Sequence, residues 1–458
     1  MSTRQKKKAD TQGQRRFKPY PTYKDSDVDW LGDIPENWEV KRLKLVAALN
    51  PTVGEVRGRT LDTEVSFVPM EAVGEYGGLD LSRTKQIAEV GTGYTYFSDG
   101  DVVVAKITPC FENGKGAHAV GLTNGIAFGT TELHVLRATK DLDDQFLFYI
   151  SLSDAFRRLG KAEMYGAGGQ KRVPEAFIEN FRPPFPSITE QRNIGVFLDR
   201  ETVKIDALVA KKERVIELLQ EKRSALITRA VTKGLDPNVS MKDSGVEWLG
   251  RIPEHWVVKP LTKYIIEKSD YRGKTPEKVI SGVFLVTAKN VKQGWIDYEC
   301  SQEFVATDEY DEIMKRGRPK NGDILFTTEA PLGNVALVDR EDIALAQRII
   351  RFRMNAKHYD NHFTLFAMMS DYFQAQLLRL STGSTAAGLK ASKLPMLRLI
   401  APPVPEQYKI VDFLVHQMAK IDALIAKVNG AIERLKEYRT ALISAAVTGK
   451  IDVREEVG

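Results

Sequence analysis

The stretch KDSDVDWLGDIPENW, residues 24–38, decides the organisation of this 458-residue chain, because it returns as KDSGVEWLGRIPEHW at residues 242–256. A second block, residues 190–232, returns at residues 406–448 with an offset of 216 instead of 218. Self-similarity at a fixed offset that spans about half the chain is the signature of an internal duplication. The order along the chain is therefore domain, helix, domain, helix.

The second block predicts one long helix in each copy. Ser187 and Glu190 form a capping-box pattern where the first helix would start. Pro405 suits the first turn of the second helix, because the N–H that proline lacks has no partner in that turn. Gly234 and Gly449 stand where the two helices would end, since glycine adopts the left-handed backbone that closes a helix.

Apolar residues recur every seven positions in both predicted helices, which is typical of a coiled-coil seam. Lys212 and Lys222 interrupt the seam of the first helix. Two equivalent units in one chain favour packing about a two-fold axis, which would make the helices antiparallel. The alternative is two amphipathic helices, each packed separately on its own domain. The predicted seam residues are Ile194, Leu198, Ile205, Leu208, Val215, Leu219 and Leu226, and Ile410, Leu414, Ile421, Leu424, Val428, Leu435 and Leu442.

The two domains share their first motif but diverge inside. Short β-branched runs between glycine-containing turns predict strands, at residues 65–70, 102–107, 283–287, 324–327 and 335–338. The predicted fold class is α/β: two mixed α/β domains separated by two long helices, which form an antiparallel intramolecular coiled coil with pseudo-two-fold symmetry. The tryptophans of the repeated motif are expected to be core anchors: Trp30, Trp38, Trp248 and Trp256.

These patterns divide the chain into six parts. The predicted boundaries are a basic disordered arm over 1–19, domain 1 over 20–186, a first long helix over 187–234, domain 2 over 235–405, a second long helix over 406–449 and a tail over 450–458.

Composition favours a soluble globular protein, with 43% hydrophobic and 28% charged residues. No run of about 18 apolar residues predicts a membrane span, and the polar, basic first residues are unlike a secretory signal. The two cysteines, Cys110 and Cys300, exclude a disulfide framework and a cysteine zinc site, so a reducing, cytoplasmic setting is expected. Residues 1–18 carry a net charge of +6 and the rest of the chain about −1. This arm is either a solvated tail or a non-specific contact to phosphates.

Several loops combine glycine with amide, hydroxyl and basic side chains. Such loops can approach phosphates through backbone N–H groups, while Arg and Lys suit guanine and Asn and Gln suit adenine. For any one residue, an ordinary solvated turn is the competing interpretation. The DNA-binding candidates are Lys106, Thr108, Asn113, Lys115, Gly168, Gln170, Lys171, Arg172, Tyr271, Arg272, Lys274, Thr275, Asn334, Gln347, Arg348, Ser384 and Thr385.

The chain resembles the DNA specificity subunits of type I restriction-modification systems from about residue 20 to about residue 449. The most specific matches are GDVVVAKITPCFENGK at residues 100–115 and YRGKTP at residues 271–276. Two proline-rich stretches that lead into Glu-Gln, PPFP at 183–186 and PPVP at 402–405, also match the start of the family's helices. The combination of these motifs with the duplication is far more specific than any one of them.

The resemblance implies a protein that binds double-stranded DNA and performs no chemistry. Each domain would read one half of a bipartite, asymmetric site, and the helices would act as a ruler for the unread spacer. Two modification subunits would dock and use S-adenosylmethionine to methylate adenine. Two restriction subunits, with ATP and Mg, could join them. This chain itself would hold no cofactor, and no membrane partner is expected.

The sequence offers weak imitations of catalytic sites. Gly273-Lys274-Thr275 lacks the earlier glycine of a phosphate loop, because Lys268 stands there. His358 and His362 have the spacing of a metal pair, but Tyr359 replaces the glutamate that a zinc protease needs. We therefore expect neither a catalytic site nor a metal site. Two alternatives stay open: an autonomous nuclease with an unrecognised site, and an interaction scaffold that binds no DNA.

Overall fold

The computed structural model describes residues 17–52, 54, 56–167, 169–271, 276–382 and 388–456. The chain forms two compact units. Unit 1 is Met1–Lys211 with Gly430–Gly458, and unit 2 is Lys212–Asn429. Each unit therefore holds one α/β domain together with a part of each long helix.

Domain 1 is built on two four-stranded sheets. The order β4-β11-β8-β9 is antiparallel throughout, whereas β6-β5-β10-β7 contains the parallel pair β5 and β10. The valine-rich strand β8 is buried along its whole length, as expected for a strand covered on both faces. The strands are β4 (Ala47–Leu49), β5 (Glu64–Val68), β6 (Thr84–Gln86), β7 (Thr95–Ser98), β8 (Asp101–Ala105), β9 (Gly116–His118), β10 (Ile126–Gly129) and β11 (Leu133–Ala138).

Domain 2 repeats this topology with little sequence in common. Its antiparallel sheet has the order β16-β22-β19-β20, and a three-stranded sheet β18-β17-β21 contains the parallel pair β17 and β21. The strands predicted in both domains are present. Those of domain 2 are β16 (Ile265–Asp270), β17 (Val283–Val286), β18 (Phe304–Val305), β19 (Ile324–Thr328), β20 (Leu332–Leu337), β21 (Ile343–Leu345) and β22 (Ile349–Met354).

The repeated motif forms the same structure at the start of each domain. It folds as a short antiparallel pair, β1 (Tyr23–Asp25) with β2 (Asp33–Pro35) and β13 (Met241–Asp243) with β14 (Arg251–Pro253). A second pair joins the beginning and end of each domain: β3 (Glu39–Val40) with β12 (Pro184–Phe185), and β15 (Val257–Pro260) with β23 (Arg398–Ala401). These pairs fix where each domain meets its helices.

The tryptophans of the motif anchor the cores as predicted. Trp38 and Trp256 are almost completely buried. The partly buried Trp30 and Trp248 each stack on an aromatic ring of their own domain, that of Phe181 for Trp30 and that of Tyr372 for Trp248. Each copy of the motif therefore supplies one buried tryptophan and one stacked tryptophan to its own domain.

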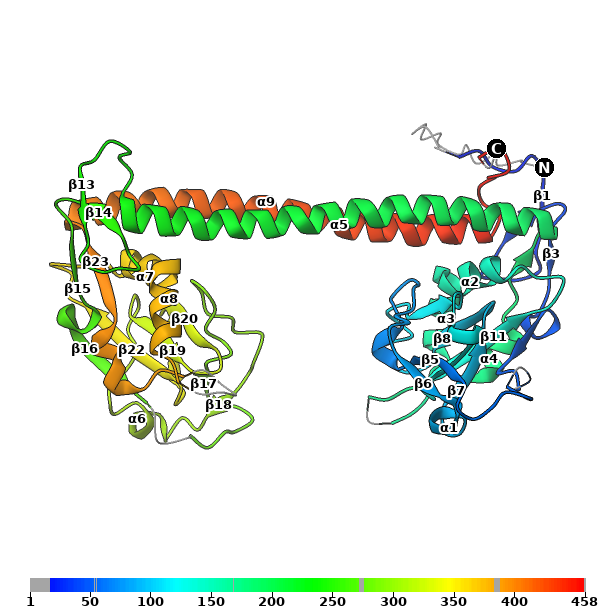
Figure 1. The fold of residues 1–458 in the computed structure, drawn as a ribbon, viewed down its shortest axis with the longest axis horizontal. Helices are drawn as coiled ribbons and strands as arrows, with labels where there is room; N and C mark the ends of the chain where they lie inside the picture. The colour runs from blue at the N-terminus through cyan, green and yellow to red at the C-terminus, as the bar shows by residue number, and fades with distance from the viewer. Residues whose placement is uncertain are drawn as a thin grey trace, which may run out of the picture. The chain divides into compact units, whose positions relative to one another are not determined.

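Two consecutive helices in each domain pack between the antiparallel sheet and the long helices (Figure 1). They are α2 (Asp144–Leu152) and α3 (Asp154–Ala162) in domain 1, and α7 (Asn361–Met369) and α8 (Asp371–Leu380) in domain 2. An aspartate caps the first helix of each pair, since Asp143 and Asp360 accept the backbone N–H three residues on. The remaining helices are α1 (Ile87–Val90), α4 (Glu175–Asn180) and α6 (Tyr310–Ile313), with 3-10 turns at Leu43–Leu45, Met70–Ala72, Thr123–Gly125, Leu261–Tyr264 and Ala391–Met396.

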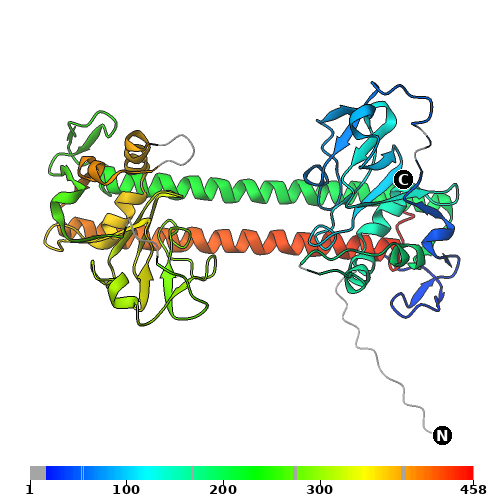
Figure 2. The same ribbon diagram turned by 90° about the horizontal axis from the view of Figure 1, so that it is seen from below.

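The two long helices are α5 (Ile188–Lys233) and α9 (Val404–Val447). Within each unit their segments lie side by side (Figures 1 and 2). An ion pair joins Asp206 to Arg439 at 3.1 Å in unit 1, and another joins Arg223 to Asp422 at 2.6 Å in unit 2. In unit 1 Arg200 bonds to Glu456 while the later Asp206 pairs with the earlier Arg439, and in unit 2 the later Gly234 lies near the earlier Glu406, so the pairing is antiparallel in both units.

Most of the residues named for the predicted seam are buried or half-buried. Leu198, Ile205, Leu414, Ile421 and Leu442 are buried, and Leu219, Leu226 and Leu435 pack against the cores. Ile194 and Ile410 are also buried, and Val428 is half-buried.

Three residues named for the predicted seam do not face inward. Leu208, Val215 and Leu424 are exposed. The positions that turn inward follow them: Val209 and Ile425 pack against the cores, and residue 216 is half-buried. A heptad row can lie three or four residues from its neighbour. Because adjacent positions are both apolar here, the sequence pattern fits either choice.

Each domain is completed by the far end of the helix that belongs to the other repeat. The backbone N–H of Asp154 donates to Ser444 on α9, and the equivalent N–H of Asp371 donates to Thr228 on α5, both at 2.9 Å. A Cβ on Gly449 would lie 3.3 Å from the Trp38 ring, and one on Gly234 would lie 3.3 Å from the Trp256 ring. Both glycines have positive φ, which ends the helix where the tryptophan covers it. Exchange of equivalent contacts between repeats is the property of an isologous interface.

The fold class predicted from the sequence is confirmed. Two mixed α/β domains alternate with two long helices, and those helices pack as an antiparallel pair. Among the described residues, no helix is both long enough and apolar enough to cross a membrane.

Candidate nucleic-acid interface

In domain 1 the predicted loops gather beside the carboxyl ends of the parallel strands β5 and β10. The loop after β8, residues 106–115, reaches both strand ends: the Lys115 ammonium donates to the carbonyl of Met70 at 3.0 Å, and the Lys106 N–H donates to the carbonyl of Glu132 at 2.9 Å. The carboxyl edge of parallel strands is where open α/β sheets bind their ligands. Strand order thus brings together residues that are far apart in the sequence.

A second loop, residues 165–173, lies against the first. The backbone N–H and the hydroxyl of Thr108 both donate to the carbonyl of Lys171. Arg172 holds Glu132 through two hydrogen bonds of 2.9 and 2.7 Å, and this guanidinium lowers the pKa of the Glu132 carboxyl. The side chains of Gln170 and Lys171 are exposed beside it. The candidate Gly168 lies outside the described residues.

A guanidinium lies beneath the first loop. Arg157 on α3 donates to the carbonyl of Phe111 at 3.0 Å and lies 4.8 Å from the centre of the Phe111 ring. Burial lowers the pKa of Arg157 to about 9. The guanidinium therefore holds the loop at residues 106–115 through the Phe111 carbonyl. Its charge adds to the positive potential of Lys106 and Lys171.

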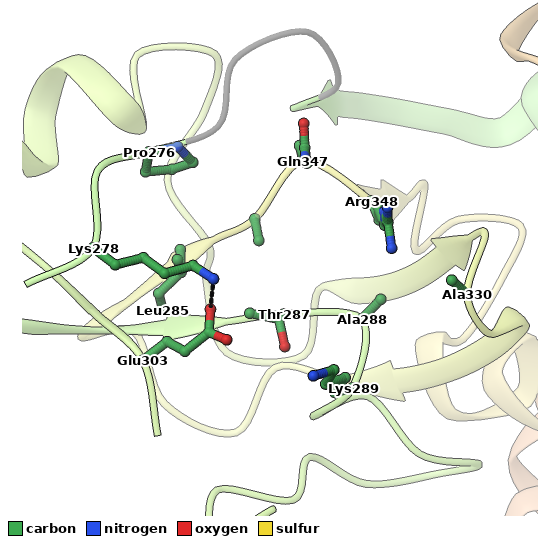
Figure 3. A pocket seen from close by; sticks show the side chains of 11 residues that line it. Pro276, Lys278, Leu285, Thr287, Ala288, Lys289, Glu303, Ala330, Gln347 and Arg348 are labelled. Atoms are coloured by element: carbon green, nitrogen blue, oxygen red, sulfur yellow. Dashed lines mark ion pairs between the residues drawn. The ribbon is translucent and has the colours of Figure 1, made fainter. Parts of the chain in front are cut away.

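Domain 2 places its candidates at the equivalent edge, after β17 and β21. The candidates Gln347 and Arg348 follow β21, and Thr287 and Lys289, which the sequence analysis did not name, follow β17. They line a cavity of about 260 Å³ (Figure 3). Lys278 and Glu303 reach toward one another in the cavity and pair at 2.8 Å. Arg348 pairs with Glu329 at 3.1 Å, so this edge mixes cations, amides and carboxylates.

Some predicted residues hold their loops rather than face solvent. The Tyr271 side chain is buried, and its hydroxyl donates to the carbonyl of Gly317. The Asn334 amide donates to the carbonyl of Val291 at 2.7 Å and accepts from Gln293. In domain 1, Asn113 is exposed but donates to Glu75 at 3.2 Å. Arg272, Lys274, Thr275, Ser384 and Thr385 lie outside the described residues.

Two hairpins beside these loops were missed by the sequence analysis. Hairpin 1, residues 73–79, is closed by a bridge between Val73 and Leu79, and hairpin 2, residues 291–296, by a bridge between Val291 and Ile296. Each follows the first parallel strand of its domain, and each carries one aromatic residue, Tyr76 or Trp295, next to glycine. Trp295 is 56% exposed. A Gly-aromatic pair at matching places in both repeats was the available signal.

The candidate interface holds no recognisable catalytic arrangement in the described part of the chain. Groups of three His, Cys, Asp or Glu side chains that could bind a metal ion are absent from the described residues. A duplicated α/β protein with a polar, cation-bearing edge on each copy is suited to binding two similar targets.

Comparison with known proteins agrees with this class. Residues 288–434 match the family described as type I restriction modification DNA specificity domain. The chain is 41% identical over 183 residues to the type I restriction enzyme EcoEI specificity subunit of Escherichia coli, which is 39% of this chain and 30% of that relative. It is 38% identical over 244 residues to the EcoAI specificity subunit of Escherichia coli, which is 53% of this chain and 40% of that relative.

A more distant relative matches along nearly the whole chain. The MjaVIII specificity subunit of Methanocaldococcus jannaschii is 24% identical over 436 residues, which is 92% of this chain and 94% of that relative. A solved chain from work on complex assembly and conformational transition of the type I R-M system has a TM-score of 0.61 at 17% identity, covering 91% of this chain and 99% of the other. This likeness shows a shared fold.

The chain spans less than half the length of the two Escherichia coli relatives and almost all of the archaeal one. The resemblance inferred from the sequence is nevertheless confirmed, because the family match, the relatives and the fold all agree. The chain is therefore similar to type I restriction-modification specificity subunits.

Proposed function

We propose that this chain is the non-catalytic subunit that chooses the DNA sequence for a type I restriction-modification complex. Each domain would read one half of a bipartite, asymmetric site in double-stranded DNA. Two modification subunits would dock and methylate adenine with S-adenosylmethionine. Through them, restriction subunits, with ATP and Mg, would join.

The observation that carries the proposal is the pair of equivalent edges with different side chains. Both edges lie at the carboxyl ends of a parallel strand pair. The first presents Lys106, Gln170 and Lys171, and the second presents Lys289, Gln347 and Arg348. Equal scaffolds with unequal surface chemistry are expected of two readers for two different half-sites.

The test is a genome-wide map of methylated adenine in cells that carry the neighbouring modification subunit, with and without this chain. Loss of one bipartite motif on removal of the chain would support the proposal and give the target sequence. An unchanged map, with the modification subunit expressed, would contradict the proposal and favour the scaffold. Cleavage of DNA by the purified chain with a metal ion would favour the nuclease.

A matched pair of variants tests the edge itself. Arg348 follows the carboxyl end of β21, whereas Arg340 pairs with Asp342 just before the amino end of the same strand. If Arg348 contacts a base, Arg348→Ala should relax discrimination at one position of one half-site by about 1–3 kcal/mol. Arg340→Ala should leave the motif unchanged. Equal effects of the two variants would place the interface elsewhere.

A further inference from the structure

Hairpin 1 and hairpin 2 occupy equivalent places in the two domains, and each contacts the segment that follows β8 or β19. In domain 1 the Tyr76 N–H donates to the carbonyl of Gly114 at 3.1 Å, and the Gly116 N–H donates to Gly74 at 3.2 Å. In domain 2 the Gly294 N–H donates to the carbonyl of Val335 at 2.8 Å. Hairpin 1 thus borders the end of the loop after β8 and the start of β9, and hairpin 2 borders β20 itself.

A residue of the helix pair holds hairpin 1. Arg439 on α9 donates to the carbonyl of Tyr76 at 3.0 Å, and its guanidinium lies 5.1 Å from the centre of the Tyr76 ring. The same guanidinium pairs with Asp206 on α5 at 3.1 Å, and the Arg439 side chain is only 14% exposed. Arg439, which is part of α9, therefore contacts both α5 and hairpin 1.

The backbone of Tyr76 needs such support. Its φ is +61°, in the left-handed region that costs a bulky residue free energy. The Tyr76 ring lies so near Gly114 that a Cβ there would come within 3.3 Å of it. A shift of Tyr76 would consequently move Gly114 or open a gap beside it.

The contacts continue from hairpin 1 to candidate DNA-binding residues. Glu75 forms a backbone bridge with Lys115. Its carboxylate accepts a hydrogen bond from the Asn113 amide at 3.2 Å. An unbroken series of contacts therefore runs from the helix pair through Arg439 and Tyr76 to the loop at residues 106–115.

Domain 2 lacks this connection in its described part. The equivalent of Arg439, 216 residues earlier, is Arg223. Arg223 donates to Asp422 at 2.6 Å and to the Met418 sulfur at 3.4 Å, both on α9. These contacts stay within the helix pair, and the exposed Trp295 of hairpin 2 has no guanidinium over it among the described contacts.

We infer that Arg439 is a positioning residue, which couples the packing of the helix pair to the loop at residues 106–115 of domain 1, a link that has no equivalent at Arg223 among the described contacts of domain 2. A change in the helix pair that displaces Arg439 would release Tyr76 and with it Asn113 and Lys115. The consequence for DNA reading rests on the proposed function. The coupling itself is a property of the protein alone.

Hydrogen exchange of the full chain tests the coupling without DNA. Arg439→Met should speed exchange roughly tenfold in peptides covering residues 73–79 and 111–116, because charge-assisted hydrogen bonds are lost. Arg439→Lys, which keeps the charge but loses the fork, should fall between. Arg223→Met is the matched control and should leave peptides covering residues 291–296 and 332–337 unchanged. Equal exchange in Arg439→Met and wild type would overturn the inference. Faster exchange throughout β8 and β11 would also overturn it, since Arg439 would then act on stability alone.

Methylation by the complex with modification subunits tests the consequence for DNA. Arg439→Met should lower discrimination about tenfold at positions of one half-site only, with Arg223→Met leaving both halves intact. If the exchange difference at hairpin 1 is observed but the wild-type complex directs no methylation, the proposed function is refuted and the coupling still holds. Loss of discrimination in both halves would overturn the assignment to domain 1.

Discussion

The antiparallel sheets of domain 1 and domain 2 have the same strand order, yet their centres are filled differently. In domain 2, Arg351 on β22 is completely buried and bonds to Asp323, Glu267 and Ser269. The equivalent residue of domain 1, 216 positions earlier, is the buried Val135 on β11. One position can therefore hold either a valine or an arginine. The topology does not depend on that choice, provided that carboxylates surround the arginine.

The buried arginine changes what the neighbouring aspartate experiences. Burial alone would raise the pKa of Asp323, but hydrogen bonds from Arg353 and Arg351 lower it below its usual value. Because the pKa is lowered in the folded state, the stabilisation is present above the unfolded pKa of about 3.9 and is lost as the pH falls through the folded value. In domain 1, Asp101 pairs instead with Arg137, which is partly exposed.

The largest expected effect follows from breaking this network. Asp323→Ala should lower the free energy of unfolding of unit 2 by about 3–5 kcal/mol, because it leaves Arg351 buried without a partner at that position. Arg351→Val, which copies domain 1, should cost less, since Asp323 keeps Arg353. Hydrogen exchange of peptides from β19 and β22 would measure both. Equal costs for the two variants would mean that the network adds nothing beyond packing.

The next prediction compares buried and exposed apolar residues of the two long helices. Ile421→Ala should cost about 2–5 kcal/mol, since Ile421 is buried between the helices. Leu424→Ala should cost no more than about 0.5 kcal/mol, because Leu424 is exposed. The same contrast holds for Ile205 and Leu208 in unit 1. Denaturant unfolding of the four variants is the measurement, and a large cost at Leu424 would restore the seam first predicted.

The two anchoring tryptophans should differ by a smaller amount. The Trp256 indole N–H donates to Glu406 at 2.9 Å, whereas the Trp38 indole N–H has no partner in the described structure. Trp256→Phe and Trp38→Phe lose similar packing, but the first also breaks a hydrogen bond to a carboxylate. Trp256→Phe should therefore destabilise its unit by about 1 kcal/mol more. Thermal unfolding would reveal the difference, and a larger cost for Trp38→Phe would contradict this reasoning.

The smallest predicted effect is a pH dependence found in domain 1. Burial alone would lower the pKa of His118, but the Asp144 carboxylate at 3.1 Å raises it above its usual value. The stabilisation is then present below the unfolded pKa of about 6.5 and is lost as the pH rises through the folded value. Strand register places Leu337 at the equivalent position of domain 2.

Unit 1 should accordingly lose roughly 1 kcal/mol or less as the pH rises from about 6 to 8, the range in which histidine titrates. His118→Gln should flatten that dependence. Hydrogen exchange of β9 at several pH values would measure it, with β20 as the internal reference. A parallel dependence in β20 would assign the effect to another group.

The sequence predicted the large features because each depends on periodicity. The internal repeat matches over many residues, and the seven-residue spacing of apolar side chains recurs along both long helices. Single ambiguous residues therefore do not hide either pattern. The prediction that Leu208 faces inward was wrong because its neighbour Val209 is also apolar, and the sequence does not say which of the two is buried. Tyr271 looked like a surface residue because it precedes a basic turn, yet its side chain is buried.

The candidate interface was predictable in its parts and not in its assembly. Glycine-rich basic loops such as residues 106–115 are visible in the sequence. Their gathering at one edge depends on β5 and β10 being parallel, which no local pattern states. The coupling through Arg439 was also hidden, because an arginine on a helix gives no sign that it reaches a carbonyl 363 residues away.

The exchange of helix ends between repeats also bears on the ancestry of this protein. Ser444 serves a domain near the start of the chain, and its counterpart Thr228 serves the domain that follows it. Contacts of this kind are what a homodimer would leave behind if its gene were copied and fused. On that model the interface would be older than the single chain, and differences such as Val135 against Arg351 would have arisen after the fusion.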